Sequence, residues 1–132
     1  MAVKQISLFL ENKAGELAEI TRLLSSNGVN LRAINIAETA DYGIVRIIAE
    51  DPQKAAQVLS ENDFILSVTP VVQVEVPDRT GGLNEILEVI AKENIDVEYM
   101  YSVFASKDGT ASMIFKVSDT EKLEEAVLKI KM

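Results

Sequence analysis

Apolar and polar residues alternate with two periodicities along this 132-residue chain, one typical of strands and one typical of helices. Residues 3–10 and 71–76 are strand-like, and in the second stretch Val72, Val74 and Val76 alternate with polar residues. A polar turn and then a helical apolar pattern follow each stretch. The apolar residues at helical spacing are Leu17, Ile20 and Leu24 after the first strand, and Leu83, Ile86 and Ile90 after the second.

The predicted helices end at residues that tolerate a left-handed backbone, Gly28 in the first and Asn94 in the second. Two further strands follow each helix, and polar turns join them. These strands are predicted at about 30–38 and 43–49, and at about 96–105 and 110–117.

A second helix then begins in each half at a capping residue. Asp51 precedes a proline, which is an N-cap followed by proline in the first turn. The counterpart begins at Ser118, with Glu121 completing a capping box. The first half closes with a fourth strand at 64–68, whereas residues 128–132 still have a helical pattern.

These matches form an internal repeat with a spacing of 66 residues. The spacing later lengthens by two, and we attribute this slip to a loop insertion between a strand and a helix. The repeats are residues 1–69 and 70–132. The pairs are Gly15 and Gly81, Leu17 and Leu83, Glu19 and Glu85, Ile20 and Ile86, and Gly43 and Gly109, followed after the slip by Asp51 and Asp119 and by Leu59 and Val127.

The order strand, helix, strand, strand, helix, strand predicts the fold of each repeat. Right-handed crossovers place both helices on one face of an antiparallel sheet, which gives a ferredoxin-like α+β sandwich. Because one repeat alone would bury little apolar surface, we expect the two side by side, sharing a long sheet with Pro70 at a kink. The second repeat lacks a final strand. It is short by one strand, or another segment fills the place, or the sequence stops before it.

The residue inventory narrows the possible chemistry. The chain has no Cys and no His, which removes disulfides, thiolate nucleophiles and the commonest general base and metal ligand. The sequence contains no recognisable metal-ligand cluster, phosphate-binding loop or nucleophile–base pair. We therefore expect no catalytic residues, no metal and no cofactor, and a protein that is not an enzyme.

The net charge of −8, with basic residues scattered singly, argues against nucleic-acid binding. No apolar run is long enough for a membrane helix. Residues 1–13 do not resemble a signal peptide, because their apolar stretch is short and is broken by Gln5 and Ser7. We expect a cytoplasmic protein that binds neither nucleic acid nor membranes.

The stretch "NKAGELAEITRLLSSNGVNLRAINI", residues 12–36, resembles the core of the ACT domain, a small βαββαβ regulatory module. Within it, "ENKAGEL" followed by "NGVNL" is especially similar to the serine-binding regulatory domain of phosphoglycerate dehydrogenases. The stretch "PDRTGGLNEILEVIAKENIDVEYMYS", residues 77–102, is a second, looser copy. The resemblance covers nearly the whole chain and implies a stand-alone tandem ACT protein without a catalytic domain.

In that family small ligands, usually amino acids, bind between adjacent ACT domains, at the loop after the first strand and the start of the second strand. The resemblance assigns this role by position to Asn12, Gly15 and Asn30 in the first copy and to Asp78, Gly81 and Asp96 in the second. The neighbouring loop residues complete the candidate set: Ala14, Glu16, Leu17, Thr80, Gly82 and Leu83. The serine-binding relatives have a His two positions before the Asn, and Leu10 stands there in this chain, which argues against serine in that pose.

Physical chemistry supports a ligand at these loops, and it also supports a purely local role. A helix N-terminus has free N–H groups and a partial positive charge that suit a carboxylate, and glycine lets the backbone approach a ligand. Asn12 can donate and accept, whereas Asp78 accepts from an ammonium. Asn and Asp are also favoured at turns and caps without any ligand. Asn30 and Asp96 would equally fit exposed strand starts.

Gly82 and Thr80 make the second loop roomier than the first, where Ala14 and Glu16 stand, and Glu16 would repel a carboxylate. We therefore favour the second loop for close approach of a ligand. Another pair, two tyrosines at 99 and 101, shares one face of a strand and fits either packing or the lining of a site.

Two functions follow from these features. The first is a non-catalytic sensor that binds an amino acid between its repeats and shifts an assembly or partner equilibrium. The second is a structural or partner-binding module that needs no ligand and pairs through exposed sheet edges. We expect the protein partner to be a second copy of the chain, giving a homodimer, or an enzyme of amino-acid metabolism that the chain regulates in trans.

Overall fold

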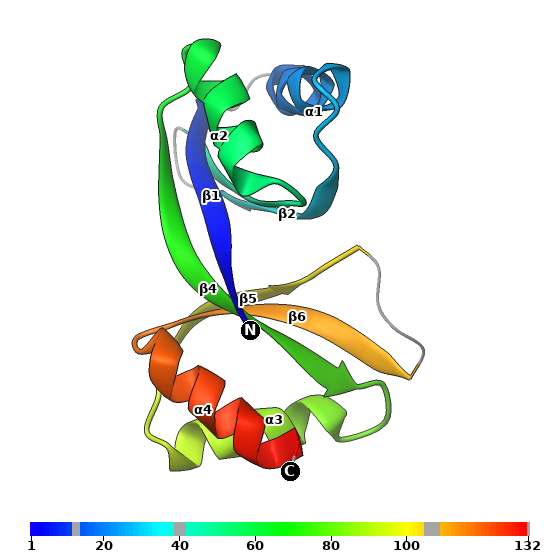
Figure 1. The fold of residues 1–132 in the computed structure, drawn as a ribbon, viewed down its shortest axis with the longest axis vertical. Helices are drawn as coiled ribbons and strands as arrows, with labels where there is room; N and C mark the ends of the chain where they lie inside the picture. Colours follow the sequence, from blue (N-terminus) through cyan, green and yellow to red (C-terminus); the bar gives the residue numbers. More distant parts are fainter. Residues whose placement is uncertain (12–13, 39–41, 105–108, 132) are drawn as a thin grey trace. The chain divides into compact units, whose positions relative to one another are not determined.

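The computed structural model describes residues 1–11, 14–38, 42–104 and 109–131. Within them, strands and helices follow one another in the predicted order (Figure 1). The elements are β1 (Ala2–Glu11), α1 (Glu16–Ser26), β2 (Leu31–Glu38), β3 (Tyr42–Ala49), α2 (Pro52–Glu61), β4 (Leu66–Pro77), α3 (Gly82–Lys92), β5 (Val97–Ser102), β6 (Thr110–Val117) and α4 (Thr120–Lys131).

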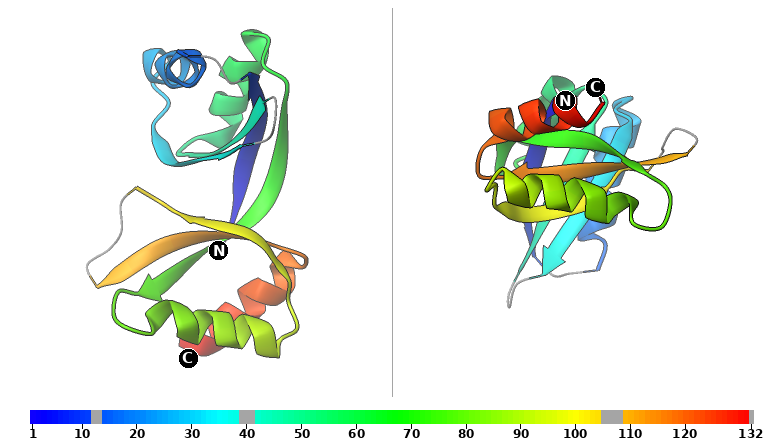
Figure 2. Two further views of the ribbon diagram at one scale, coloured as in Figure 1. Left: turned by 180° about the vertical axis from the view of Figure 1, so that it is seen from behind. Right: turned by 90° about the horizontal axis from the view of Figure 1, so that it is seen from below.

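The chain divides into two compact units. We call Lys4–Thr69 the first unit, and Met1–Val3 together with Pro70–Met132 the second unit. The strands are hydrogen-bonded in the order β2-β3-β1-β4-β6-β5. Each unit carries its two helices on one face of its strands (Figures 1 and 2). The predicted α+β fold of ferredoxin-like repeats is therefore confirmed.

The core of the first unit forms where alternating strand residues meet a helical stripe. Ile6, Leu8 and Leu10 point to one face of β1, because successive strand residues point to opposite faces. They pack against Ile20 and Leu24, which recur at helical spacing on α1. Burying these apolar side chains is the main force that holds the helices to the strands.

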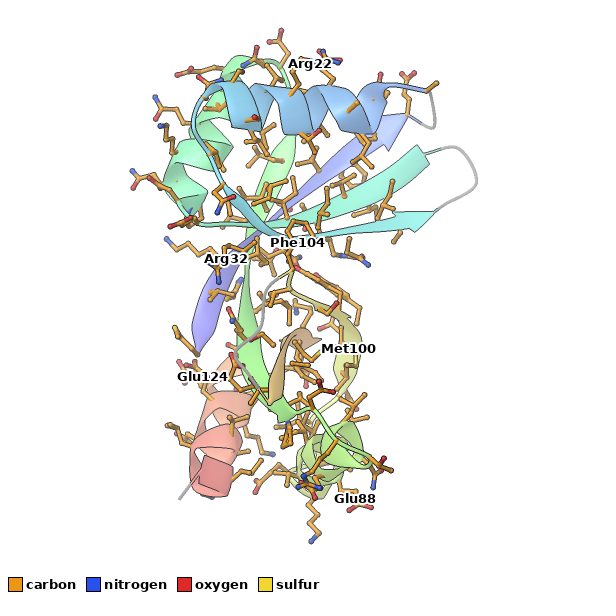
Figure 3. The ribbon with its side chains drawn as sticks, turned by 90° about the vertical axis from the view of Figure 1, so that its right-hand side faces the viewer. Arg22, Arg32, Glu88, Met100, Phe104 and Glu124 are labelled. Carbon is orange, nitrogen blue, oxygen red and sulfur yellow. The ribbon has the colours of Figure 1, made fainter. Side chains whose placement is uncertain are left out.

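The core of the second unit repeats this arrangement. The three alternating valines of β4 pack against Ile86 and Ile90 of α3 and against the fully buried Phe115 of β6. Met100 of β5 packs at the margin of the same cluster (Figure 3). The match between the two cores explains why the apolar positions recur through both halves of the sequence.

The predicted C-terminal ends of α1 and α3, the first helices of the two units, are confirmed. Gly28 has a φ of 73° and Asn94 a φ of 56°, so both adopt the left-handed conformation. The next amide then donates back to the last helical turn, over 2.9 Å from Val29 and 3.2 Å from Ile95. These bonds satisfy carbonyl groups that a helix end would otherwise leave without partners.

The start of the chain fills the place of the strand that the second repeat lacks. Gln73 of β4 donates its N–H to the Met1 carbonyl oxygen over 2.8 Å, and the Met1 nitrogen donates to the Gln73 carbonyl oxygen over 3.1 Å. The Ala2 N–H donates to Glu124 Oε2 on α4 over 3.2 Å (Figure 3). Of the three alternatives that the sequence leaves open, the structure supports another segment filling the place.

The two-residue slip in the repeat lies elsewhere than predicted. Leu8 pairs with Val45 between β1 and β3, and Val74 pairs with Met113 between β4 and β6. Leu8 and Val74 keep the spacing of 66 residues, whereas Val45 and Met113 already include the two extra residues. The insertion therefore lies before β6, in the β5–β6 connection. The prediction that it lies between a strand and a helix is wrong.

One of the two predicted helix caps is also corrected. The Asp51 carboxylate caps α2 by accepting a backbone N–H over 3.1 Å, as predicted. At α4 the capping carboxylate belongs to Asp119, which accepts a backbone N–H over 3.1 Å. The predicted capping box from Ser118 to Glu121 is wrong by one residue, because Ser118 Oγ instead accepts the Asp96 N–H over 3.3 Å.

Candidate ligand-binding loops

Each unit enters its first helix at a glycine in the left-handed conformation. The first loop is residues 12–17 and the second loop is residues 78–83. Gly15, with a φ of 89°, and Gly81, with a φ of 83°, are the N-cap residues of α1 and α3. Among the described residues, no side chain caps either helix. This region of backbone conformation favours glycine, which accounts for the repeated residue.

The two N-cap glycines border open space, but Gly82 does not. A Cβ added at Gly15 or Gly81 would have no heavy atom of the described residues within 4 Å, so these residues leave the backbone there open to a ligand. Gly82 is buried, and an added Cβ would lie 2.0 Å from the Pro77 carbonyl oxygen. The interpretation of Gly82 as extra room for a ligand is therefore wrong, since its missing Cβ serves packing.

Asp78 opens the second loop on the surface. Its N–H donates to the Gly109 carbonyl oxygen over 2.9 Å, which fixes the backbone of the loop. Its exposed carboxylate has no hydrogen bond or ion pair within the described part of the chain. Because Gly81 is the N-cap of α3, Asp78 does not cap that helix. Its repeat counterpart Asn12 lies outside the described residues.

The remaining loop residues differ between the repeats in charge more than in exposure. Leu17 and Leu83, in the first turns of α1 and α3, are 37% and 38% exposed, so each leaves an apolar side chain beside its loop. Ala14 and Thr80 are exposed. Glu16 places a carboxylate in the first turn of α1, where the second loop has the uncharged Gly82 instead.

The two predicted strand-start residues hold equivalent positions in their units. Asn30 accepts the Glu50 N–H at its carbonyl oxygen over 2.9 Å and donates from its side chain to Glu50 Oε2 over 3.0 Å. Asp96 accepts the Ser118 N–H at its carbonyl oxygen over 3.1 Å. Both side chains are exposed, and the Asp96 carboxylate has no partner among the described residues.

Within one unit, the loop and the strand start do not meet. Gly15 and Asn30 stand beyond opposite ends of α1, and Gly81 and Asp96 beyond opposite ends of α3. Each helix has 11 residues, which corresponds to a length of about 16 Å. One unit therefore cannot supply both its own loop and its own strand start to a single site.

Arg79 is a loop residue that the sequence interpretation missed. Its guanidinium donates to both carboxylate oxygens of Glu85, over 2.8 Å each, in the first turn of α3. Both side chains are more than half exposed. The signal in the sequence is the recurrence of the pair, since Lys13 and Glu19 hold the same positions in the first repeat. An Arg fork of this kind is well shaped for a ligand carboxylate.

A second missed residue is Glu75, on β4 just before the second loop. It accepts the Ser112 hydroxyl over 2.6 Å and the Thr110 hydroxyl over 3.0 Å. The equivalent position in the first repeat is Phe9, which is 59% exposed. The strand that leads to the second loop is thus polar where its counterpart is apolar, and this signal is visible in the aligned repeats.

The tyrosine pair of β5 is a packing feature. The rings of Tyr99 and Tyr101 are stacked, with centroids 6.5 Å apart and an angle of 14° between the planes. Tyr101 is only 7% exposed. Stacking and burial account for this pair without a ligand.

The described residues contain neither a candidate metal cluster nor a candidate membrane-spanning helix. Among them, no three His, Cys, Asp or Glu side chains are grouped so that they could hold a metal ion. None of the helices in this part of the chain is long and apolar enough to span a bilayer.

Comparisons with known proteins agree with the repeat. The sequence profile of one family, described as an ACT domain pair, matches residues 1–132. No curated protein matches the chain. Among solved structures, protein BT0572 from Bacteroides thetaiotaomicron is 39% identical, with a TM-score of 0.91 over 99% of this chain and 90% of that chain.

More distant structures share the fold alone. The ligand-free regulatory subunit of aspartate kinase from Thermus thermophilus is 14% identical, with a TM-score of 0.71 over 97% of this chain and 90% of that chain. The regulatory subunit of aspartate kinase from Thermus flavus is 16% identical, with a TM-score of 0.63 over 98% of this chain and 92% of that chain.

Proposed function

The chain belongs to the ACT domain family as a pair of ACT domains, and from this premise we propose that it is a non-catalytic regulatory protein that binds a small amino acid. The repeated loop carries the proposal. In both copies a left-handed glycine, Gly15 or Gly81, leaves open space beside a helix start that no side chain of the described residues caps. Uncapped helix starts of this kind attract anions.

An amino acid needs a partner for its carboxylate and another for its ammonium group, and the second loop offers both. The start of α3 carries about half a positive charge, and Arg79 can turn from Glu85 to a ligand carboxylate. Asp78 can accept from the ammonium, and Leu83 can contact an apolar side chain. In this proposal the second loop is therefore the main binding site, because Glu16 repels a carboxylate at the first loop.

In this proposal the rest of the site comes from a second copy of the chain. The loop and the strand start of one unit lie at opposite ends of a helix, so one unit cannot supply both. Asn30 and Asp96 are the strand-start residues proposed to face a loop. Asn30 offers a donor and an acceptor, and Asp96 offers a carboxylate for the ammonium.

Calorimetric titration with each of the twenty amino acids tests the proposal. We expect at least one to bind with a dissociation constant below about 1 mM, or about −4 kcal/mol of binding free energy. The methyl ester of that amino acid, which lacks the carboxylate charge, and its N-acetyl derivative, which lacks the ammonium, should each bind at least tenfold more weakly. Absence of binding by all twenty amino acids at 10 mM, taken as roughly tenfold above that constant, contradicts the proposal.

The outer strands support a second candidate function, a partner-binding module without a ligand. β2 and β5 lie at the two ends of the strand order, and edge strands invite pairing with another chain. Each has a shift of pairing register at a charged residue, Arg32 in β2 and Glu98 in β5. Such an irregularity limits which partner strands can pair with the edge. The partner in this reading is a second copy or an enzyme of amino-acid metabolism.

Light scattering over a hundredfold range of protein concentration separates the two candidates. A module that pairs with itself gains mass with concentration whether or not an amino acid is present. For a sensor, the average mass of the particles changes only when the amino acid that it binds is added. A monomer at every concentration, with and without amino acids, contradicts self-pairing.

A further inference from the structure

Two strands belong to both compact units, and each leads to one of the candidate loops. β1 starts at Ala2 in the second unit and ends at Glu11, beside the first loop, in the first unit. β4 starts at Leu66 in the first unit and ends at Pro77, beside the second loop, in the second unit. Each loop therefore follows a strand whose far end belongs to the other unit.

Near its loop, each shared strand is held in an antiparallel ladder. Residues 6–11 of β1 pair with β3, and residues 72–77 of β4 pair with β6. Any change in the backbone of a loop therefore acts directly on a continuous set of ladder hydrogen bonds. The buried face of each strand fixes the register of its ladder, so the strand cannot slip by one residue to absorb such a change.

At its far end, each shared strand is held in the other unit. Leu66 of β4 packs against the core of the first unit. Met1 exchanges two backbone hydrogen bonds with Gln73, and the Ala2 N–H donates to Glu124, within the second unit. We call this attachment of Met1–Val3 to Gln73 and Glu124 the clasp.

A coupling through the clasp requires it to have two states, attached and open. The hydrogen bonds that Met1 and Ala2 donate lie at exposed positions, and exposed strand ends are among the regions that open without global unfolding. When it is open, the second unit lacks its fourth strand. One strand, β1, therefore links the two units. It pairs with β3 in the first unit, and its first residues supply the fourth strand of the second unit.

We propose that β1 and β4 couple the two loops, so that a ligand at one loop changes the order and the ligand affinity of the other. The regulatory meaning of this coupling rests on the proposed function, but the coupling itself does not need a ligand. A ligand that orders one shared strand lowers the conformational entropy that the other loop must still lose when it binds its own ligand. The second binding event is then more favourable, which is positive cooperativity. By linkage, the effect is the same in both directions.

Hydrogen exchange of the ligand-free protein tests the coupling from the second unit to the first. Gln73→Pro removes the N–H that binds Met1. It should remove no bond to β6, because the N–H and carbonyl of one residue in an antiparallel ladder point to the same neighbour. We expect the amides of residues 6–20 to exchange roughly two- to tenfold faster, which is the factor that one net hydrogen bond represents. Gln73→Ala keeps the N–H and should leave their exchange unchanged.

Two glycines of the first unit, one as the test and one as its control, probe the coupling in the reverse direction, from the first unit to the second. Gly15 and Gly28 both have positive φ and space for a Cβ at that position, so replacing either by Ala strains the same unit. Only Gly15 belongs to the loop that follows a shared strand, whereas Gly28 follows α1. Gly15→Ala should accelerate exchange of residues 70–77 in the second unit roughly two- to tenfold, and Gly28→Ala should not.

If Gln73→Pro does not fold, Glu124→Ala weakens the clasp more gently, with Glu124→Gln as the control that keeps an acceptor oxygen. Acceleration in the unit that carries no substitution, absent from the controls, supports the coupling. Acceleration confined to the substituted unit, or equal in the variants and their controls, overturns it. Neither result depends on amino-acid binding, so the coupling and the proposed function can fail separately.

Discussion

Gly82 lies so close to Pro77 that a Cβ on Gly82 would be 2.0 Å from the Pro77 carbonyl oxygen. Gly82→Ala should therefore lower the free energy of unfolding by about 3 kcal/mol, the upper part of the range for overpacking. Gly81→Ala is the control, because its Cβ meets open space and only the positive φ is strained. It should cost about 1 kcal/mol. Urea unfolding followed by circular dichroism measures both, and equal losses would show that the contact with Pro77 relaxes easily.

The capping carboxylates of α2 and α4 give a second prediction. Asp51→Ala and Asp119→Ala should each lower the free energy of unfolding by about 1 kcal/mol, because each leaves a helix N–H without its acceptor. Ser118→Ala should cost less, since its hydroxyl contacts Asp96 and does not cap α4. Thermal unfolding of the three variants measures the order. A larger loss for Ser118→Ala than for Asp119→Ala would restore the capping box predicted from the sequence.

The ion pair of the second loop should matter for binding and little for stability. Arg79→Gln should change the free energy of unfolding by less than about 0.5 kcal/mol, because both partners are exposed. It should weaken the best-binding amino acid about tenfold, the effect of losing one charge-assisted pair with a carboxylate. Calorimetry measures the affinity.

Lys116→Gln is the matched control for Arg79→Gln. It removes a different ion pair of the second unit, which joins Lys116 to Glu98 over 2.9 Å and lies outside both loops. Its amino-acid affinity should equal that of the unmodified protein. If both variants lose affinity to the same extent, the effect belongs to overall charge and not to the guanidinium of Arg79.

The sequence predicted the elements and the repeat because both depend on local patterns. The valines of β4 and the stripe from Ile86 to Ile90 have the periods of a strand and a helix, and the core follows from those periods. Gly28 and Asn94 mark helix ends through a conformation that few other residues adopt. Such signals need no knowledge of distant contacts.

The sequence could not predict features that depend on contacts between distant residues. The pairing of Met1 with Gln73 joins residues 72 positions apart, and the three residues Met1–Val3 are too few to show a periodicity that would assign them to the second unit. The role of Gly82 depends on the approach of Pro77, which local rules do not describe. The choice of Asp119 over Ser118 as the cap is a shift of one residue, within the usual uncertainty of helix boundaries.

The most direct test of the central claim, amino-acid binding at the second loop, is the affinity of Asp78→Asn for the amino acid that the unmodified protein binds best. The substitution keeps the shape of the side chain and removes the charge that would hold an ammonium group. Asp63→Asn is the control, an equal change of charge at an exposed residue outside both loops. The account predicts that Asp78→Asn weakens binding at least tenfold, or by about 1.4 kcal/mol, while Asp63→Asn has no effect. Equal affinities for the two variants and the unmodified protein would contradict it.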